Sequence, residues 1–178
     1  MVVPNVVSFN GFLIELSSAM LEKRMDVHCA CSLDGLWGSG EKLIDTPVQM
    51  HGLPFARGMN PVAHVKTSLQ LNSLVSSIRP DIVHAHFSSA ILTMALARRR
   101  HWPVTIGTFQ GVSFLLMRGT RKRFLKMAET WASSRLDKVW VLTEDDRVGL
   151  STAAPGVKVK KQLSCGFGCD LDRFNPAR

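Results

Sequence analysis

The sequence predicts an α/β fold built on a doubly wound, mostly parallel sheet. Short apolar runs rich in β-branched residues alternate with longer segments whose apolar residues recur at helical spacing, a pattern typical of parallel strands joined by helical crossovers. The clearest example is a strand–helix–strand unit at 82–86, 90–97 and 104–108. The length of 178 residues corresponds to about one domain with a substantial core.

The chain opens on a predicted strand, Val2–Val7, although Pro4 cannot donate a hydrogen bond to a neighbouring strand. Asn10 and Gly11 are expected to form the turn after it. Apolar residues at helical spacing then predict a helix from Phe12 to about residue 24. The next strand is expected at 27–31.

Residues 32–46 are rich in glycine and polar residues and predict a loop. Gly35, Gly38 and Gly40 lack both the spacing and the strand–glycine–helix order of a dinucleotide fingerprint, which argues against an NAD site. A short strand is expected at 48–52. A helix at 62–78 follows, and Pro80 ends it.

The strand–helix–strand unit directs the search for function. Ser88 and Ser89 are predicted to cap its helix, and the cations at 98–100 suit the helix C-terminus. Ligands of parallel sheets gather at the carboxyl ends of the strands. His84, His86 and Gln110, the last followed by Gly111, stand near those ends.

A helix predicted at 120–134 carries positive charge at the end that its dipole disfavours, at a cost of about 0.3–1 kcal/mol per exposed charge. An anionic lipid surface or a phosphorylated acceptor would explain the arrangement, and so would a solvated helix face. The cations of this segment are Arg118, Arg121, Lys122, Arg123 and Lys126.

Two further strands are predicted at 137–142 and 157–163. Between them, Thr143 is expected to cap a helix whose first turn is acidic. Helix capping explains these acids as a group. Glu144 is kept as a candidate cleft residue because it also follows the carboxyl end of a strand.

Composition limits the classes of function. The net charge of +8 suggests an acidic partner, but the aromatic interleaving and modules of nucleic-acid binders are missing from the sequence. No apolar run is long enough to span a membrane and no signal peptide is evident, so a cytoplasmic location is expected. The spacings of Cys29 with Cys31 and of Cys165 with Cys169 do not favour a metal site, and reduced, packed thiols are expected.

Three motifs together resemble the N-terminal half of the GT-B glycosyltransferases of the large retaining family 4. The first is Arg79-Pro-Asp-Ile-Val-His-Ala-His86, which is similar to the family's "PDxVHxH" strand. Trp140-Val-Leu-Thr-Glu-Asp-Asp-Arg-Val-Gly-Leu150 resembles its "xxVSExxxxxL" strand-to-helix step. Gly168-Cys-Asp-Leu-Asp-Arg-Phe-Asn-Pro176 resembles the "NGxDxxxFxP" passage that leads into the second domain.

This resemblance implies a Rossmann-like acceptor-binding domain at 1–168 and, at 169–178, the start of a linker to a C-terminal domain. That second domain, which this chain does not include, would bind the nucleoside-diphosphate sugar donor. The chain itself is therefore expected to bind no cofactor, and to be an inactive half of a hexosyltransferase when alone. The implied acceptor is a polysaccharide or glycolipid, as in lipopolysaccharide or capsule assembly.

The resemblance also assigns positions. Asn10 and Gly11 match a turn that approaches the donor phosphates, and His86 matches the second histidine of the family strand. Gln110 stands where many members have histidine, and its amide could orient a sugar hydroxyl. With Gly111 and Glu144 these residues form the predicted cleft, with no catalytic residue assigned. The alternative is a non-catalytic interaction module, one that could dock peripherally on an anionic membrane at the inner face.

Overall fold

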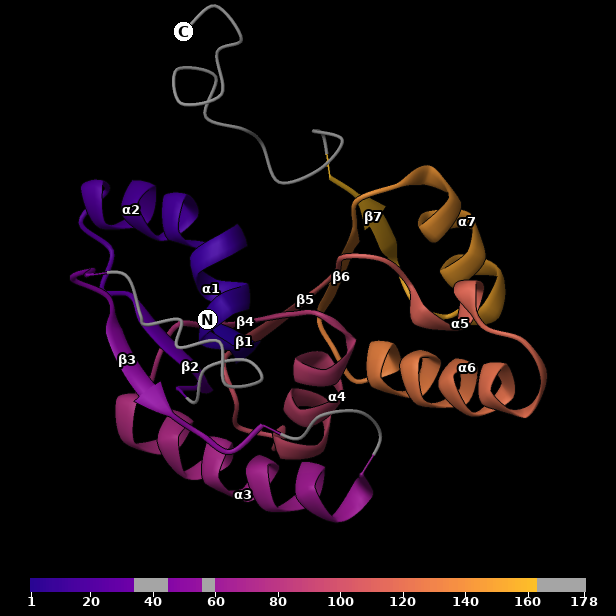
Figure 1. The fold of residues 1–178 in the computed structure, drawn as a ribbon, viewed down its shortest axis with the longest axis horizontal. Coiled ribbons are helices and arrows are strands. Elements are labelled where there is room, and N and C mark those ends of the chain that lie inside the picture. The colour runs from indigo at the N-terminus through magenta and orange to yellow at the C-terminus, as the bar shows by residue number, and fades with distance from the viewer. Residues whose placement is uncertain (34–44, 56–59, 163–178) are drawn as a thin grey trace, which may run out of the picture.

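The computed structural model describes residues 1–33, 45–55 and 60–162, which form one seven-stranded, all-parallel sheet (Figure 1). Its order is β3-β2-β1-β4-β5-β6-β7, which confirms the doubly wound α/β prediction. The predicted loop glycines at 35–40, Cys165 and Cys169, the third motif and the proposed domain boundary lie outside the described residues. The strands are β1 Val2–Asn5, β2 His28–Ser32, β3 Gln49–Gly52, β4 Ile82–His86, β5 Val104–Phe109, β6 Lys138–Val141 and β7 Val159–Lys161.

Helices cover the sheet on two faces. From β1 to β3 the strand order runs one way, and from β4 to β7 it runs the other way, so right-handed crossovers place the two sets of helices on opposite faces. In Figure 1, α1 and α2 lie above the strands, and α3, α4 and α6 lie below. The helices are α1 Val6–Phe12, α2 Ile14–Glu22, α3 Pro61–Ile78, α4 Ser88–Ala97, α5 Ser113–Leu116, α6 Gly119–Ser134 and α7 Glu144–Ala153.

The first strand is shorter than predicted. It ends at Asn5, whose side-chain Oδ1 accepts a hydrogen bond from the Ser8 backbone N at 2.8 Å and caps α1. The register of β1 against β2 is irregular between Val2 and Asn5, the interval that contains Pro4. Asn10 and Gly11 therefore lie within α1, and their assignment to a turn was wrong. The capping signal of Asn5 outweighed the apolar run that follows it.

The core has two parts, one on each side of the sheet. On one side, Ile91 and Met94 of α4 are fully buried and belong to the same cluster as Phe109 and Val139. On the other side, apolar residues of α1 pack with β1 and β2. Cys29 and Cys31 are buried there as free thiols, which confirms the prediction of packed thiols for these two cysteines. That second cluster contains Val3, Val6, Phe9, Leu13, Val27, Cys29, Cys31 and Val48.

The described residues contain neither a metal-binding group of side chains nor a membrane-spanning helix. No group of histidine, cysteine or acidic side chains within the described ranges could hold a metal ion. None of the helices in that part of the chain is long and apolar enough to cross a membrane.

The buried position of Met94 yields a test of this packing. We expect Met94→Ala to lower the free energy of unfolding by about 2–5 kcal/mol, because it removes buried side-chain atoms and leaves a cavity. Met25 is exposed, so Met25→Ala should change that free energy by less than about 0.5 kcal/mol. Urea unfolding of both variants measures the difference, and equal effects would contradict the placement of α4 in the core.

Candidate functional site

The candidate site lies at the carboxyl ends of β1 and β4, where the winding of the sheet changes direction. The chain leaves β1 into α1 on one face and leaves β4 into α4 on the other. In doubly wound sheets, the strand ends where neighbouring connections part in this way are the usual ligand position. His86 is the last residue of β4, and Gln110 follows β5, the adjacent strand.

Four polar side chains share one face of this edge. Alternation along the strands puts His84 and His86 of β4 on the same side as Thr108, the register partner of His86, and Gln110 two residues beyond it. The His84 Nε2 lies 2.7 Å from the Thr108 Oγ1, and the two imidazole rings are 4.0 Å apart between centroids. Trp140 of β6 places its ring edge-on to His84 at 5.5 Å. His84 and His86 were predicted from the sequence because they stand near the end of a strand. The sheet places Thr108 and Trp140 next to His84.

Four buried atoms of this group have no hydrogen-bond partner among the described residues: both ring nitrogens of His86, and the amide oxygen and nitrogen of Gln110. The His86 side chain is almost wholly buried, with 3% of the residue exposed. Each unsatisfied buried polar group costs about 1–3 kcal/mol. A ligand that supplies hydroxyl groups at this position would offset that cost.

Both histidines are electrically neutral. The pKa of His86 is lowered to about 2, mainly by burial and to a smaller extent by the neighbouring His84 and the N-terminal ammonium. Burial, assisted by the N-terminal ammonium, lowers the pKa of His84 to about 4. A neutral imidazole has one donor and one acceptor nitrogen. His86 therefore suits a neutral hydroxyl group better than a phosphate, which would prefer a cation.

Two carboxylates hold the loop that carries Gln110. Glu129 of α6 is buried; its Oε1 accepts from the Ser113 N at 3.1 Å and the Ser88 Oγ at 2.6 Å, and its Oε2 from the Phe114 N at 3.1 Å. Asp146 of α7 accepts from the Val112 N at 2.9 Å. These bonds fix the backbone on the C-terminal side of Gln110. Glu129 is not among the residues predicted from the sequence, although a single acid in the buried stripe of a helix is a usable signal.

Gly111 permits the turn between Gln110 and this anchored loop. Its φ of 110° lies in the region that only glycine adopts without strain. Val112 thereby reaches Asp146, whose other oxygen accepts from the Thr143 hydroxyl at 2.7 Å. Thr143 caps α7 as predicted, accepting from the Asp146 N. Gly111 thus contributes to the predicted cleft only by setting the backbone path from Gln110 into the anchored loop.

The backbone is strained next to His86. Phe87 has φ 71° and ψ 147°, a conformation that costs a residue with a β-carbon about 1–3 kcal/mol. Its ring packs edge-on against Phe12 of α1 at 5.8 Å, so the contact joins the two elements that diverge at these strand ends. Phe87 also precedes α4 without a side-chain cap, and Ser88 is already the first helical residue. The predicted serine caps were wrong because Glu129 takes the Ser88 hydroxyl.

The other predicted site residues are placed differently. The exposed Glu144 forms an ion pair with Arg147, whose Nε lies 2.8 Å from the Glu144 Oε1, and the hydrogen bond from Arg147 lowers the pKa of the Glu144 carboxyl. The Asn10–Gly11 pair belongs to α1, away from the end of β1. The five cations of 118–126 lie exposed on and beside α6. The structure thus brings together His86, Gln110 and Gly111 and leaves Glu144 in a surface pair.

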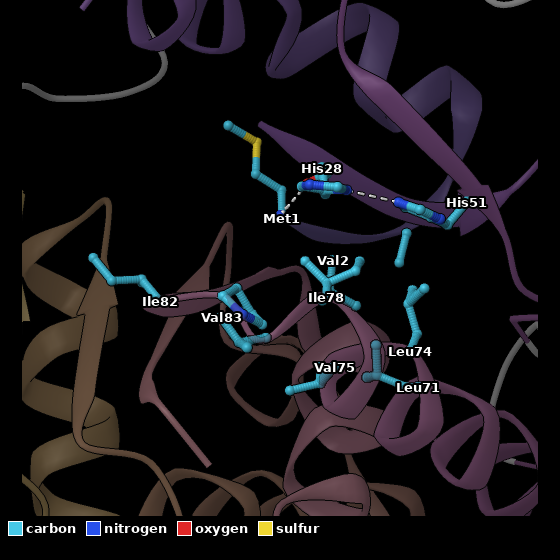
Figure 2. A pocket seen from close by; sticks show the side chains of 12 residues that line it. Met1, Val2, His28, His51, Leu71, Leu74, Val75, Ile78, Ile82 and Val83 are labelled. Carbon is cyan, nitrogen blue, oxygen red and sulfur yellow. Dashed lines mark hydrogen bonds between the residues drawn. The ribbon is translucent and has the colours of Figure 1, made fainter. Parts of the chain in front are cut away.

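A separate cavity lies under β1 and β2, against α3 (Figure 2). It holds about 40 Å³ and is lined mainly by apolar side chains, with Leu71, Leu74 and Val75 on the α3 side. Figure 2 shows His28 bonded to His51 at its wall, with 2.9 Å between ring nitrogens. Space for one or two waters is far too small for a sugar, so this cavity is not the candidate site.

An all-parallel sheet of this order, with helices on both faces, defines a Rossmann-like α/β domain. The chain belongs to the glycosyl transferase 4-like domain family, whose profile matches residues 13–155. This membership makes it a glycosyltransferase domain and confirms the resemblance drawn from the motifs.

A solved structure with the same fold is sucrose-phosphate synthase from Thermosynechococcus elongatus. It is 11% identical with a TM-score of 0.58, and the match covers 98% of this chain and 92% of that one. No curated protein sequence matches this chain significantly.

The anchoring role of Glu129 can be tested by an isosteric change. We expect Glu129→Gln to lower the free energy of unfolding by about 1–3 kcal/mol, because an amide nitrogen replaces one of the two acceptor oxygens and faces backbone N–H donors. Glu15→Gln, at an exposed position in α2, is the matched control and should have a much smaller effect. Denaturant titrations compare the two; similar losses would show that the Glu129 bonds contribute nothing special.

The neutral histidines predict a pH dependence of stability. Below the ordinary histidine pKa of 6.5 the unfolded chain takes up protons that His84 and His86 do not bind in the folded state. The free energy of unfolding therefore falls as the pH falls from 6.5 towards 4, by up to about 1.4 kcal/mol per pH unit for each ring. We expect His86→Gln to flatten this slope between pH 7 and pH 5 in urea titrations. A slope equal to that of the parent chain would mean that His86 titrates normally.

Proposed function

We propose that this chain is the acceptor-binding domain of a retaining hexosyltransferase. In this proposal a separate domain binds a nucleoside-diphosphate sugar, and the crevice at β1 and β4 binds the polysaccharide or glycolipid that receives the sugar. The proposed transfer would belong to lipopolysaccharide or capsule assembly. Family membership supports the transferase class, and the division of roles rests on the motif resemblance.

One observation carries the acceptor role: four buried polar atoms of His86 and Gln110, at the strand ends, find no hydrogen-bond partner in the part of the chain that the structure describes. A sugar hydroxyl both donates and accepts hydrogen bonds. One hydroxyl can therefore accept from the protonated nitrogen of the neutral His86 and a different hydroxyl can donate to its bare nitrogen. The Gln110 amide can bind a further hydroxyl through either of its two polar atoms. Gln110 has no basic group for proton abstraction, so both residues are assigned to binding and orientation.

The loop architecture supports such a role. Glu129 and Asp146 hold the backbone at 112–114 through buried hydrogen bonds. A binding residue whose backbone is fixed in advance loses less conformational freedom when the ligand binds. The strained Phe87 beside His86 is the local element whose rearrangement would open the buried ring to a ligand. Strain of this kind occurs often at binding sites.

Saturation-transfer NMR with a panel of hexoses and short oligosaccharides tests the acceptor role on the chain as it stands. We expect His86→Ala and Gln110→Ala each to weaken binding of the best panel member at least tenfold, the equivalent of about 1.4 kcal/mol. The exposed His101 and Gln70 provide the matched controls His101→Ala and Gln70→Ala, which should bind like the parent chain. Circular dichroism checks that all four variants are folded.

Calorimetry with nucleoside-diphosphate sugars tests the division of roles. The chain alone should show no measurable binding, since donor recognition is assigned to another domain. Micromolar affinity for a donor would contradict that assignment. Unchanged sugar binding in His86→Ala and Gln110→Ala would remove both residues from the site.

A further inference from the structure

An apolar groove runs between three helices on the face of the sheet opposite α1 and α2. Its volume is about 360 Å³, comparable to a small-molecule pocket. Every lining residue except one histidine is apolar, and that histidine, His64, lies 2.8 Å from the Thr93 hydroxyl through its Nδ1. The groove is lined by Pro61, His64 and Val65 of α3, Leu92 and Leu96 of α4, and Phe124, Met127, Ala128 and Trp131 of α6.

The walls of this groove are exposed to solvent. Met127 is 64% exposed, and Phe124, Trp131 and Val65 are between 40% and 48% exposed. Val62 and Leu69 extend the apolar surface along the outer stripe of α3. Soluble monomers seldom expose large hydrophobic side chains in a contiguous group, and such a patch usually marks a docking surface.

Positive charge borders the apolar surface, and none of the described residues that line the groove is acidic. Arg121 and Arg123 precede Phe124 and Met127 by three and four residues, so each pair is adjacent on the surface of α6. Lys66 stands among the exposed apolar residues of α3. The only acid in α3, α4 and α6 is Glu129, which is buried and bonded to Ser88, Ser113 and Phe114. None of these cations forms an ion pair with another described residue.

We propose that this surface docks on an anionic lipid bilayer, with the groove between α3, α4 and α6 inserted among the acyl chains. Lipid headgroups would neutralise Arg121 and Arg123, while Phe124, Met127 and Trp131 leave water. An apolar face bordered by arginine and lysine is the arrangement that binds peripheral proteins to anionic membranes. A protein partner for the groove would need acidic groups around an apolar ridge, and a second copy of this basic surface would repel the first.

The docking surface also has a defined position relative to the crevice. Because α6 follows β5, its N-terminal cations lie at the same edge of the sheet as His86 and Gln110. Membrane contact through this end would hold the crevice beside the headgroup layer. The inference itself rests on the groove and its charges and is independent of the acceptor role.

Vesicle co-sedimentation tests the proposal on the full chain. We expect binding to phosphatidylglycerol-containing vesicles, little binding to pure phosphatidylcholine, and weakening by salt. The triple variant Arg121→Glu, Lys122→Glu, Arg123→Glu should bind at least about 100-fold more weakly. Reversal of the three exposed lysines Lys158, Lys160 and Lys161 changes the net charge equally on another surface and should have a much smaller effect.

A second measurement tests insertion of the groove. Acyl chains brominated near the headgroup should quench tryptophan fluorescence of the bound chain, and Trp131→Phe should remove most of that quenching. Met127→Ser should weaken binding severalfold, whereas Met25→Ser, at a similarly exposed but distant position, should not.

Three outcomes would overturn the proposal. They are no binding to anionic vesicles at low salt, equal losses in the two charge reversals, and quenching that Trp131→Phe leaves unchanged. A dimer in solution that Met127→Ser dissociates would assign the groove to a second copy instead. These variants leave His86 and Gln110 intact, so we expect them to bind sugars in the NMR experiment as tightly as the parent chain does. The membrane-docking proposal and the acceptor-binding proposal can therefore be contradicted independently.

Discussion

The parallel pairing of β1 between β2 and β4 is the constraint on which the rest of this structure depends. Right-handed crossovers must place helices on one face as the chain moves from β1 to β3 and on the other as it moves from β4 to β7. The carboxyl ends of β1 and β4 are therefore left between diverging connections. His86 stands at that point, and Phe87 and Phe12 bridge the two sides. The sheet order alone thus determines where a ligand can approach the backbone closely.

Two buried carboxylates fix the backbone beside this position. Glu129 and Asp146 come from helices that lie later in the chain, yet they bind the backbone immediately after β5. Each accepts from buried N–H groups that would otherwise lack partners. The contrast with His86 and Gln110 is informative. The two carboxylates that support the loop have hydrogen-bond partners, whereas the buried polar atoms of His86 and Gln110 have none within the part of the chain that the structure describes.

The two faces of the sheet differ in the apolar surface that their helices expose. On the face with α1 and α2, the second apolar cluster is buried between helix and sheet. The opposite face carries α3, α4 and α6, with an apolar groove and basic borders. Burial of one stripe of α6 against the core leaves Phe124, Met127 and Trp131 outside it, so helix formation alone does not explain these residues. Exposure of these apolar side chains to water has a thermodynamic cost, which the proposed docking on a membrane would remove.

The sequence by itself determined the fold class, the strand and helix at 82–97, the cap at Thr143, and the family. These depend on local periodicity and short motifs, which one segment of chain contains in full. The prediction for Asn10 and Gly11 was wrong because a capping asparagine and an apolar run favour different structures for the same few residues. The prediction for Ser88 was wrong because Glu129, 41 residues away, accepts a hydrogen bond from that hydroxyl. Only the tertiary structure decided that Glu144 forms a surface ion pair and that Glu129 anchors the loop. It also decided that His86 is neutral and has no hydrogen-bond partner in the described ranges. Burial and hydrogen-bond pairing arise from segments far apart in the chain, so no local pattern could contain them.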